Sequence, residues 1–549
     1  MKVNLPLMIQ DPMTIRTSTD PNMPRFEKID VETTDDCRDF LDGPVTPKVA
    51  VLDFDPATGE LLPGARLAEN LVKGKARYDI SEDIYSPGFI QVSVLGAILK
   101  TMRLFERPEV LGRPITWAFG APQLLVIPRA GDWANAFYER SSHSLQFFSF
   151  TNPNDETQTV HTSLSRDIVA HETAHAIIDG IAPALYDAVT PQSLALHEAL
   201  ADLVALITAV GSYNLRHGVL DQTQGNIRDS TVFSSLAPEF GAALDREGGS
   251  SALRNLHNET ALKPSMREPH ELSTVLSGAL YAVLLQLYDD VWQQENLDLT
   301  RAHYALSVAA IVFGRLVFRA IDFLPPGEVS FADYGRALVA AERSATGAVR
   351  PEIATLVDEF RKRGIIAKNS GLEVNRDGWD AVPRVDAQLL LQNESDAYEF
   401  VNENRALLNV PAGVPFRIAA RYHTKKDSPP KAKAHVYKEE LILKVSWDVT
   451  ESHDFDPQFP NTRKVQCGTT FVVDWYTGAV ETVLTADIAP QKAERDGMIE
   501  ELYASGLLDH PAEMRAEERS AATVDVDVRS GSLRLSGAAR LLHIAGRQS

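Results

Sequence analysis

Five apolar segments between Ser165 and Arg343 constrain the fold of this chain more than any other feature. Their apolar residues recur at helical spacing, and glycine or proline residues separate one segment from the next. Such segments bury their apolar faces against one another, so we expect a mostly helical lobe. The expected helices are residues 165–180, 192–210, 273–294, 301–321 and 330–343.

The segments on either side of this lobe have β-type patterns. Upstream, we expect a short strand at residues 49–54, a helix at 91–105, a buried strand at 123–127 and a hairpin at 135–150. Downstream, the alternating residues of 440–449 and 469–485 predict strands of a further β-rich unit. The mixture predicts an α+β fold.

Three units are the simplest division of the chain, since 549 residues are too many for one ordinary domain. We predict an N-terminal extension at 1–85, a core domain at 86–366 and a β-rich accessory domain at 367–549.

The formal net charge of −21 bears on the choice of partners. A strongly acidic chain repels phosphate backbones and anionic membrane surfaces, so we do not expect nucleic acid as a partner. One basic stretch, residues 421–438, surrounds a pair of prolines. We interpret it as a solvated loop, and an anion site is the alternative.

The N-terminal residues show no secretory signal, so we expect a cytoplasmic protein. An apolar patch near the start is interrupted at residues 10–12, before it could form the core of a secretory signal. Cys37 and Cys467 lie far apart and suggest no disulfide framework. Apolar runs such as 305–314 are shorter than the roughly 20 residues of a membrane span. We therefore expect no span; non-classical secretion is the alternative, and the oligomeric state stays unknown.

The first helical segment contains His171, Glu172 and His175 in the order HETAH. The two histidines are at i and i+4, so they project from one face of a helix and can bind one metal ion. Glu172 then lies beside a metal-bound water as a general base. So short a pattern also arises by chance, and two surface histidines on an ordinary helix are the alternative.

The next helical segment supplies a candidate third ligand. A catalytic zinc ion has three protein ligands and keeps a fourth position for water. Glu198 and Asp202 lie at i and i+4 in an apolar segment, where unpaired carboxylates are costly. We interpret Glu198 as the ligand and Asp202 as the acceptor of a ring N–H of a ligand histidine. The alternative is that both acids face solvent. His197 is turned away from this face and is not expected to bind the metal.

These residues resemble the thermolysin-like gluzincins, zinc peptidases in which HExxH precedes a glutamate ligand and then an aspartate. The resemblance covers about residues 120–343. It implies a thermolysin-like peptidase core with a β-rich N-terminal lobe, a helical C-terminal lobe and zinc in the cleft. It also implies that Tyr186 and His270 stabilise the oxyanion of the transition state. A packed aromatic residue and an exposed structural histidine are the ordinary alternatives.

The same resemblance implies a substrate site. Asn135 and Ala136 match the edge strand that holds substrate in the family. Arg254 matches an arginine that contacts the substrate carbonyl, and Ile168 lies near the pocket for an apolar residue. A turn residue and a surface cation are the alternatives for Asn135 and Arg254.

The chain also departs from the family. We recognise no signal and no inhibitory propeptide, although the family is usually exported with both. Few acids follow Glu198, and Asp167 alone does not make a calcium site, so calcium is not predicted. Glu268 is closer to His270 than the aspartate that orients the family's histidine.

The sequence therefore predicts a zinc-dependent metalloendopeptidase that acts on a protein or peptide, with Glu172 as base and then acid. Two alternatives stay open. One is an intracellular processing peptidase of narrow specificity, and the other is a catalytically silent, zinc-stabilised module that binds proteins.

Overall fold

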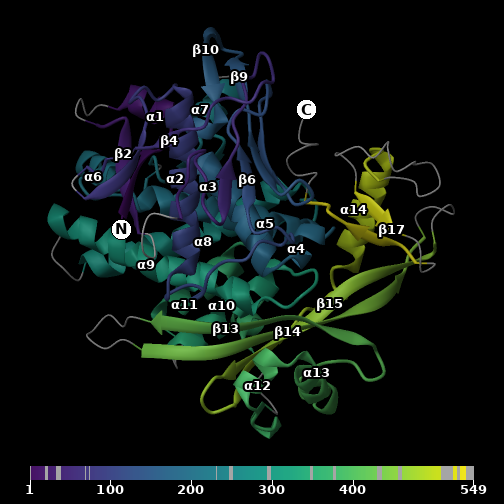
Figure 1. The fold of residues 1–549 in the computed structure, drawn as a ribbon. Coiled ribbons are helices and arrows are strands. Elements are labelled where there is room, and N and C mark those ends of the chain that lie inside the picture. Colours follow the sequence, from purple (N-terminus) through teal and green to yellow (C-terminus); the bar gives the residue numbers. More distant parts are fainter. Residues whose placement is uncertain are drawn as a thin grey trace.

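The computed structural model is a mixed fold of helices and several sheets (Figure 1). Two small sheets lie on one side of a central group of long helices, and a four-stranded sheet with longer strands lies on the opposite side (Figure 1). The structure describes residues 2–539 except 19–22, 33–38, 69, 73, 230, 246–251, 294–297, 347–349, 375–378, 429–435, 455–459, 509–523 and 528–531. The predicted mixture of helices and sheets is confirmed.

All five helices predicted for the central lobe are present. They are α3 (Arg166–Ile181), α5 (Pro191–Val210), α8 (Pro269–Gln293), α9 (Leu299–Phe323) and α10 (Phe331–Thr346). Helix α3 begins where the side chain of Ser165 accepts a hydrogen bond from the Ile168 amide, and α5 has a proline in its first turn. Helix α5 is buried along almost its whole length and packs against α3 and α8.

Two sheets form the N-terminal part of the structure. The first has the order β2-β1-β5-β4, with strands Phe26–Glu32, Lys2–Met8, Lys75–Asp79 and Arg66–Leu67. The second has the order β3-β6-β8-β7, with strands Val49–Val51, Leu124–Ile127, Ser144–Phe147 and Ala136–Glu139. Helix α2 (Pro87–Glu106) packs against β1 and α3. The strand, helix and hairpin expected in this part are thus confirmed.

The second sheet crosses the limit predicted at residue 85. Strand β3 comes from the predicted extension, yet it pairs in parallel with β6, where Val49 is opposite Leu124. Strand β7 pairs only with β8 among the described residues and forms an edge of this sheet, next to α3. The division into three domains stays a prediction.

The C-terminal part contains a sheet of four antiparallel strands in chain order. They are β13 (Phe416–Ser428), β14 (Val436–Ser452), β15 (Thr462–Asp474) and β16 (Val480–Thr485). The basic stretch predicted to be a loop instead forms the facing ends of β13 and β14, and its tip lies outside the described residues. Cys467 on β15 is buried with a free thiol, while Cys37 also lies outside the described residues.

The remaining elements are shorter. They are α1 (Pro12–Thr17), β9 (Ser149–Asn152), β10 (Asp155–His161), α4 (Ala184–Asp187), α6 (Tyr213–Gln222), β11 (Ser235–Leu236), α7 (Pro238–Leu244), β12 (Arg254–Asn255), α11 (Pro351–Lys362), α12 (Ala387–Gln392), α13 (Glu394–Glu403), α14 (Lys492–Ala504), β17 (Asp525–Asp527) and β18 (Arg534–Ser536).

Four helices are long and apolar enough to cross a membrane by length and composition, namely α2, α5, α8 and α9. Each of these helices also contains polar residues, so it is longer than the uninterrupted apolar runs in the sequence. In the most apolar 18-residue window of each helix, between 67% and 100% of the residues are buried inside the fold. The apolar residues of these helices therefore pack against the rest of the protein. The absence of a span stays a prediction.

A buried network of charges joins the C-terminal sheet to the helical lobe. Lys426 of β13 lies 3.1 Å from Asp322 of α9 and 3.7 Å from Glu440 of β14. Arg319 contacts Glu440 at 3.3 Å, and Arg113 contacts Asp322 at 2.7 Å. Burial alone would raise the pKa of Asp322, but Arg113 and Lys426 outweigh it and lower the pKa to about 2. The carboxylate is therefore ionised at neutral pH, and the sheet is docked through compensated charges.

Replacing Lys426 by methionine tests this docking. The Lys426→Met variant leaves Asp322 and Glu440 buried with less compensating charge, so we expect the free energy of unfolding to fall by about 3–5 kcal/mol. Urea denaturation followed by circular dichroism measures the change. The matched control is Lys28→Met, which removes an exposed pair with Glu82 and should have little effect. Equal stability of the two variants would contradict the docking role.

Candidate metal centre

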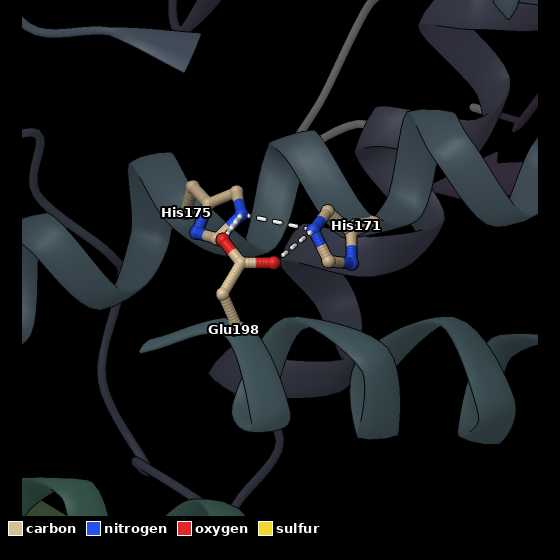
Figure 2. Close-up of side chains that lie close together, drawn as sticks. All are labelled: His171, His175 and Glu198. Carbon is tan, nitrogen blue, oxygen red and sulfur yellow. Dashed lines mark hydrogen bonds and ion pairs between the residues drawn. The ribbon is translucent and has the colours of Figure 1, made fainter. Parts of the chain in front are cut away.

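Helices α3 and α5 bring three metal-binding side chains together (Figure 2). Nε2 of His175 lies 2.9 Å from Nε2 of His171. The carboxylate of Glu198 lies 3.4 Å from His171 and 3.3 Å from His175 through its two oxygens. All three side chains are buried, and their ligand atoms converge on one point between the helices.

The separations can be compared with those around a metal ion. Two ligand atoms of a tetrahedral zinc lie about 3.3–3.5 Å apart. The two separations that involve Glu198 agree with this, and the one between the histidines is a few tenths of an ångström shorter. Two imidazole nitrogens and one carboxylate suit a first-row transition metal, whereas calcium and magnesium take oxygen ligands. The residues therefore fit the metal that the sequence predicts.

Asp202 and Arg254 adjoin the histidine nearer the cleft. Nδ1 of His171 lies 3.0 Å from Oδ1 of Asp202, which also accepts hydrogen bonds from Arg254 at 2.7 and 3.0 Å. Burial alone would lower the pKa of His171, but Asp202 and Glu198 outweigh it and raise the pKa to about 9. The pocket thus holds more negative than positive charge, which a bound metal cation would balance.

His197 contacts the other ligand histidine. Its Nδ1 lies 2.8 Å from Nδ1 of His175, and the two rings stack with centroids 4.6 Å apart. Burial lowers the pKa of His175 well below its usual value, so this imidazole is neutral and its Nε2 can bind a metal. His197 lies outside the converging set and contacts the ligand His175 instead.

A cleft of about 1060 Å³ opens beside the metal-binding cluster. Six of the residues predicted from the sequence to act on substrate or metal-bound water lie on its wall. They are Glu172, Asn135, Ala136, Ile168, Arg254 and His270. His171 and Asp202 also line it, so the cluster is reached from the cleft through His171.

The position of Glu172 is fixed by the neighbouring sheet. Its carboxylate accepts a hydrogen bond of 3.1 Å from the backbone amide of Tyr138 in edge strand β7. His270, in the first turn of α8, also lines the cleft. Its Nδ1 contacts Glu268 at 2.8 Å, and its Nε2 lies 3.6 Å from Glu198. Glu268 thus contacts His270, although it lies only two residues before it in the sequence.

Of the residues predicted to act on substrate or metal-bound water, Tyr186 is the one that does not line the cleft. It is buried in α4, where the Arg140 guanidinium lies 4.2 Å from the centre of its ring. Its hydroxyl accepts a hydrogen bond of 3.4 Å from the Arg140 amide. Ion pairs from Arg140 to Asp179 and Asp187 fix this packing. The role of Tyr186 in stabilising an oxyanion stays a prediction.

Several apolar residues of the cleft were not predicted from the sequence. Trp133, Phe240, Leu244 and Leu253 come from three separate segments and line the cleft. No local pattern marks them, because only the packing of α7, β12 and the β7 region brings them together. They give the cleft an apolar surface next to its charged centre.

Comparison with known proteins adds a distant structural similarity. No protein-family model matches the chain, and no curated protein matches it. Among solved structures, it is similar to the precursor of protealysin, a metalloproteinase from Serratia proteamaculans, with 15% identity and a TM-score of 0.36. The similarity covers 61% of this chain and 92% of that one. So low a TM-score carries no argument about function, which must rest on the residues of the site.

Replacing Asp202 by asparagine tests the metal centre. Asparagine keeps the shape but removes the charge that Asp202 places beside His171 and Arg254, so we expect zinc affinity to fall about 10–100-fold. Competition with a chelator measures the dissociation constant. Asp167→Asn is the matched control, since Asp167 is a buried carboxylate of the same cleft that contacts Gln10 and the Ala237 amide. Similar affinities for both variants would contradict the role of Asp202.

Proposed function

We propose that this chain is a zinc-dependent endopeptidase. The observation that carries the proposal is the convergence of His171, His175 and Glu198 beside a cleft whose wall includes Glu172. Two imidazoles, one carboxylate and an adjacent carboxylate that is not a ligand form the set needed for metal-assisted hydrolysis.

The chemistry of the proposed reaction divides between metal and protein. Zinc held by the three ligands would polarise the peptide carbonyl and lower the pKa of a bound water to about 7. Glu172 takes the proton of the attacking water and passes it to the leaving amine, so one carboxylate acts first as base and then as acid. The Tyr138 amide holds this carboxylate toward the cleft.

Cationic and hydrogen-bonding groups in the cleft are suited to the negative charge that develops on the carbonyl oxygen. His270 lies on the cleft wall, and its contact with Glu268 orients its ring. Arg254 lies on the same wall, but its guanidinium is bonded to Asp202, so we assign it mainly to positioning the metal ligands. Tyr186 would contribute only after its side chain had turned away from Arg140.

The proposed substrate is an extended segment of a protein or peptide. Strand β7, which begins at Ala136 directly after Asn135, is an edge strand, and such an edge can accept substrate as an additional strand. Trp133, Phe240 and Leu253 then offer an apolar surface for a side chain next to the scissile bond. We therefore propose a preference for apolar residues at that position.

Replacing Glu172 by glutamine tests the reaction. Glutamine cannot accept the water proton, so we expect kcat to fall about 10²–10⁴-fold while zinc content is unchanged. Digestion of a peptide library, read by mass spectrometry with and without a chelator, measures cleavage. Glu271→Gln is the matched control, because Glu271 also lines the cleft and is not assigned to catalysis. Bound zinc without cleavage by the unchanged protein would favour the binding module, and cleavage after full removal of zinc would refute the mechanism.

Replacing Leu253 by aspartate tests the apolar wall. Leu253 lines the cleft and is 39% exposed, so a carboxylate there meets the substrate without disturbing the core. We expect kcat/KM for peptides with a bulky apolar residue beside the scissile bond to fall about 10–200-fold. Leu389→Asp is the control, since Leu389 is 47% exposed on α12 and does not line the cleft. An unchanged preference in Leu253→Asp would place the substrate elsewhere.

A further inference from the structure

A second group of metal-binding side chains lies between α6 and α9. His217 and Asp221 are at i and i+4 of α6, so they project from the same face of that helix. His303 projects from the first part of α9, which packs against α6. One ligand atom from each residue lies within 4.8 Å of the others. None of these residues belongs to the cluster on α3 and α5.

The side chains of this group lie close enough together to share one ion, since their ligand atoms are within 4.8 Å of one another. The imidazole rings of His217 and His303 stack with centroids 3.7 Å apart and planes inclined by 27°. Nε2 of His303 lies 3.7 Å from Oδ1 of Asp221. That is too long for a hydrogen bond, and it is near the separation of about 3.3–3.5 Å between two ligand atoms of a tetrahedral zinc.

The surroundings leave His303 available to a metal. Its side chain is only 15% exposed, and Nδ1 is buried with no hydrogen-bond partner among the described residues. The imidazole nitrogens of histidine are among the commonest ligands of metal ions in proteins. The Tyr213 ring also contacts His217, with centroids 4.2 Å apart and planes inclined by 48°.

We propose that His217, Asp221 and His303 form a second metal site, which binds a divalent transition metal such as zinc and links α6 to α9. Two imidazoles and one carboxylate suit such an ion. Asp221 is 62% exposed, so water can occupy the remaining positions. Because α6 begins at Tyr213, directly after α5 ends at Val210, the site fixes the far end of the helix that carries Glu198.

Metal counting on the full chain tests the proposal. Protein stripped with a chelator, reloaded with zinc and separated from free metal should contain about two equivalents by elemental analysis. His303→Ala and His217→Ala should each lose about one of them, and so should His171→Ala. The double variant His171→Ala/His303→Ala should retain almost none. His423→Ala is the matched control, because His423 also stacks on an aromatic ring, Trp475, and contacts a carboxylate, Glu439, without a third ligand.

Thermal unfolding gives a second readout that does not depend on activity. In the His171→Ala background, zinc or cobalt should raise the melting temperature, since the metal binds the folded chain, and this rise should be lost in His303→Ala and reduced in Asp221→Asn. Circular dichroism checks that each variant folds. If His303→Ala and His217→Ala bound as much zinc as the unchanged protein, the two histidines would merely stack on each other, and the proposal would be overturned. Loss of metal from His303→Ala but not from His171→Ala would instead refute the catalytic centre and retain this site.

Discussion

The burial of Glu198 inside α5 is the constraint on which the site depends. A carboxylate without solvent is destabilising unless opposite charge and hydrogen-bond donors surround it. The structure supplies His171 and His175 from α3, Arg254 from β12 and His270 from α8. These side chains must therefore surround the carboxylate, and α3 and α8, which carry three of them, pack against α5.

The balance of charge at this centre explains why a metal fits it. Glu198 and Asp202 contribute two buried negative charges, and Arg254 alone is permanently positive beside them. The environment consequently favours a protonated His171, which is the same environment that favours a divalent cation. Buried carboxylates also lie where the C-terminal sheet packs on the helical lobe. There their negative charge is compensated by Lys426, Arg319 and Arg113, so no metal is needed.

The N-terminal residues contribute more to the core than their sequence indicates. The Gln10 carbonyl accepts a hydrogen bond from the Arg166 amide, and its side chain donates to Asp167 in the first turn of α3. Strand β3 belongs to the same sheet as edge strand β7, whose Tyr138 amide donates a hydrogen bond to the side chain of Glu172. The start of the metal-binding helix and the position of its base are thus supported by a segment that we predicted to be an extension.

The sequence by itself determined the helices and the candidate ligands, because helical periodicity and the i, i+4 spacing of His171 with His175 and of Glu198 with Asp202 are local properties of the chain. Only the tertiary structure decided which surface each of the other side chains meets. It placed Tyr186 on Arg140, bonded Arg254 to Asp202, and brought His303 to His217 across two helices. The physical reason is that contacts between elements distant in sequence depend on how whole faces pack, which no local pattern records.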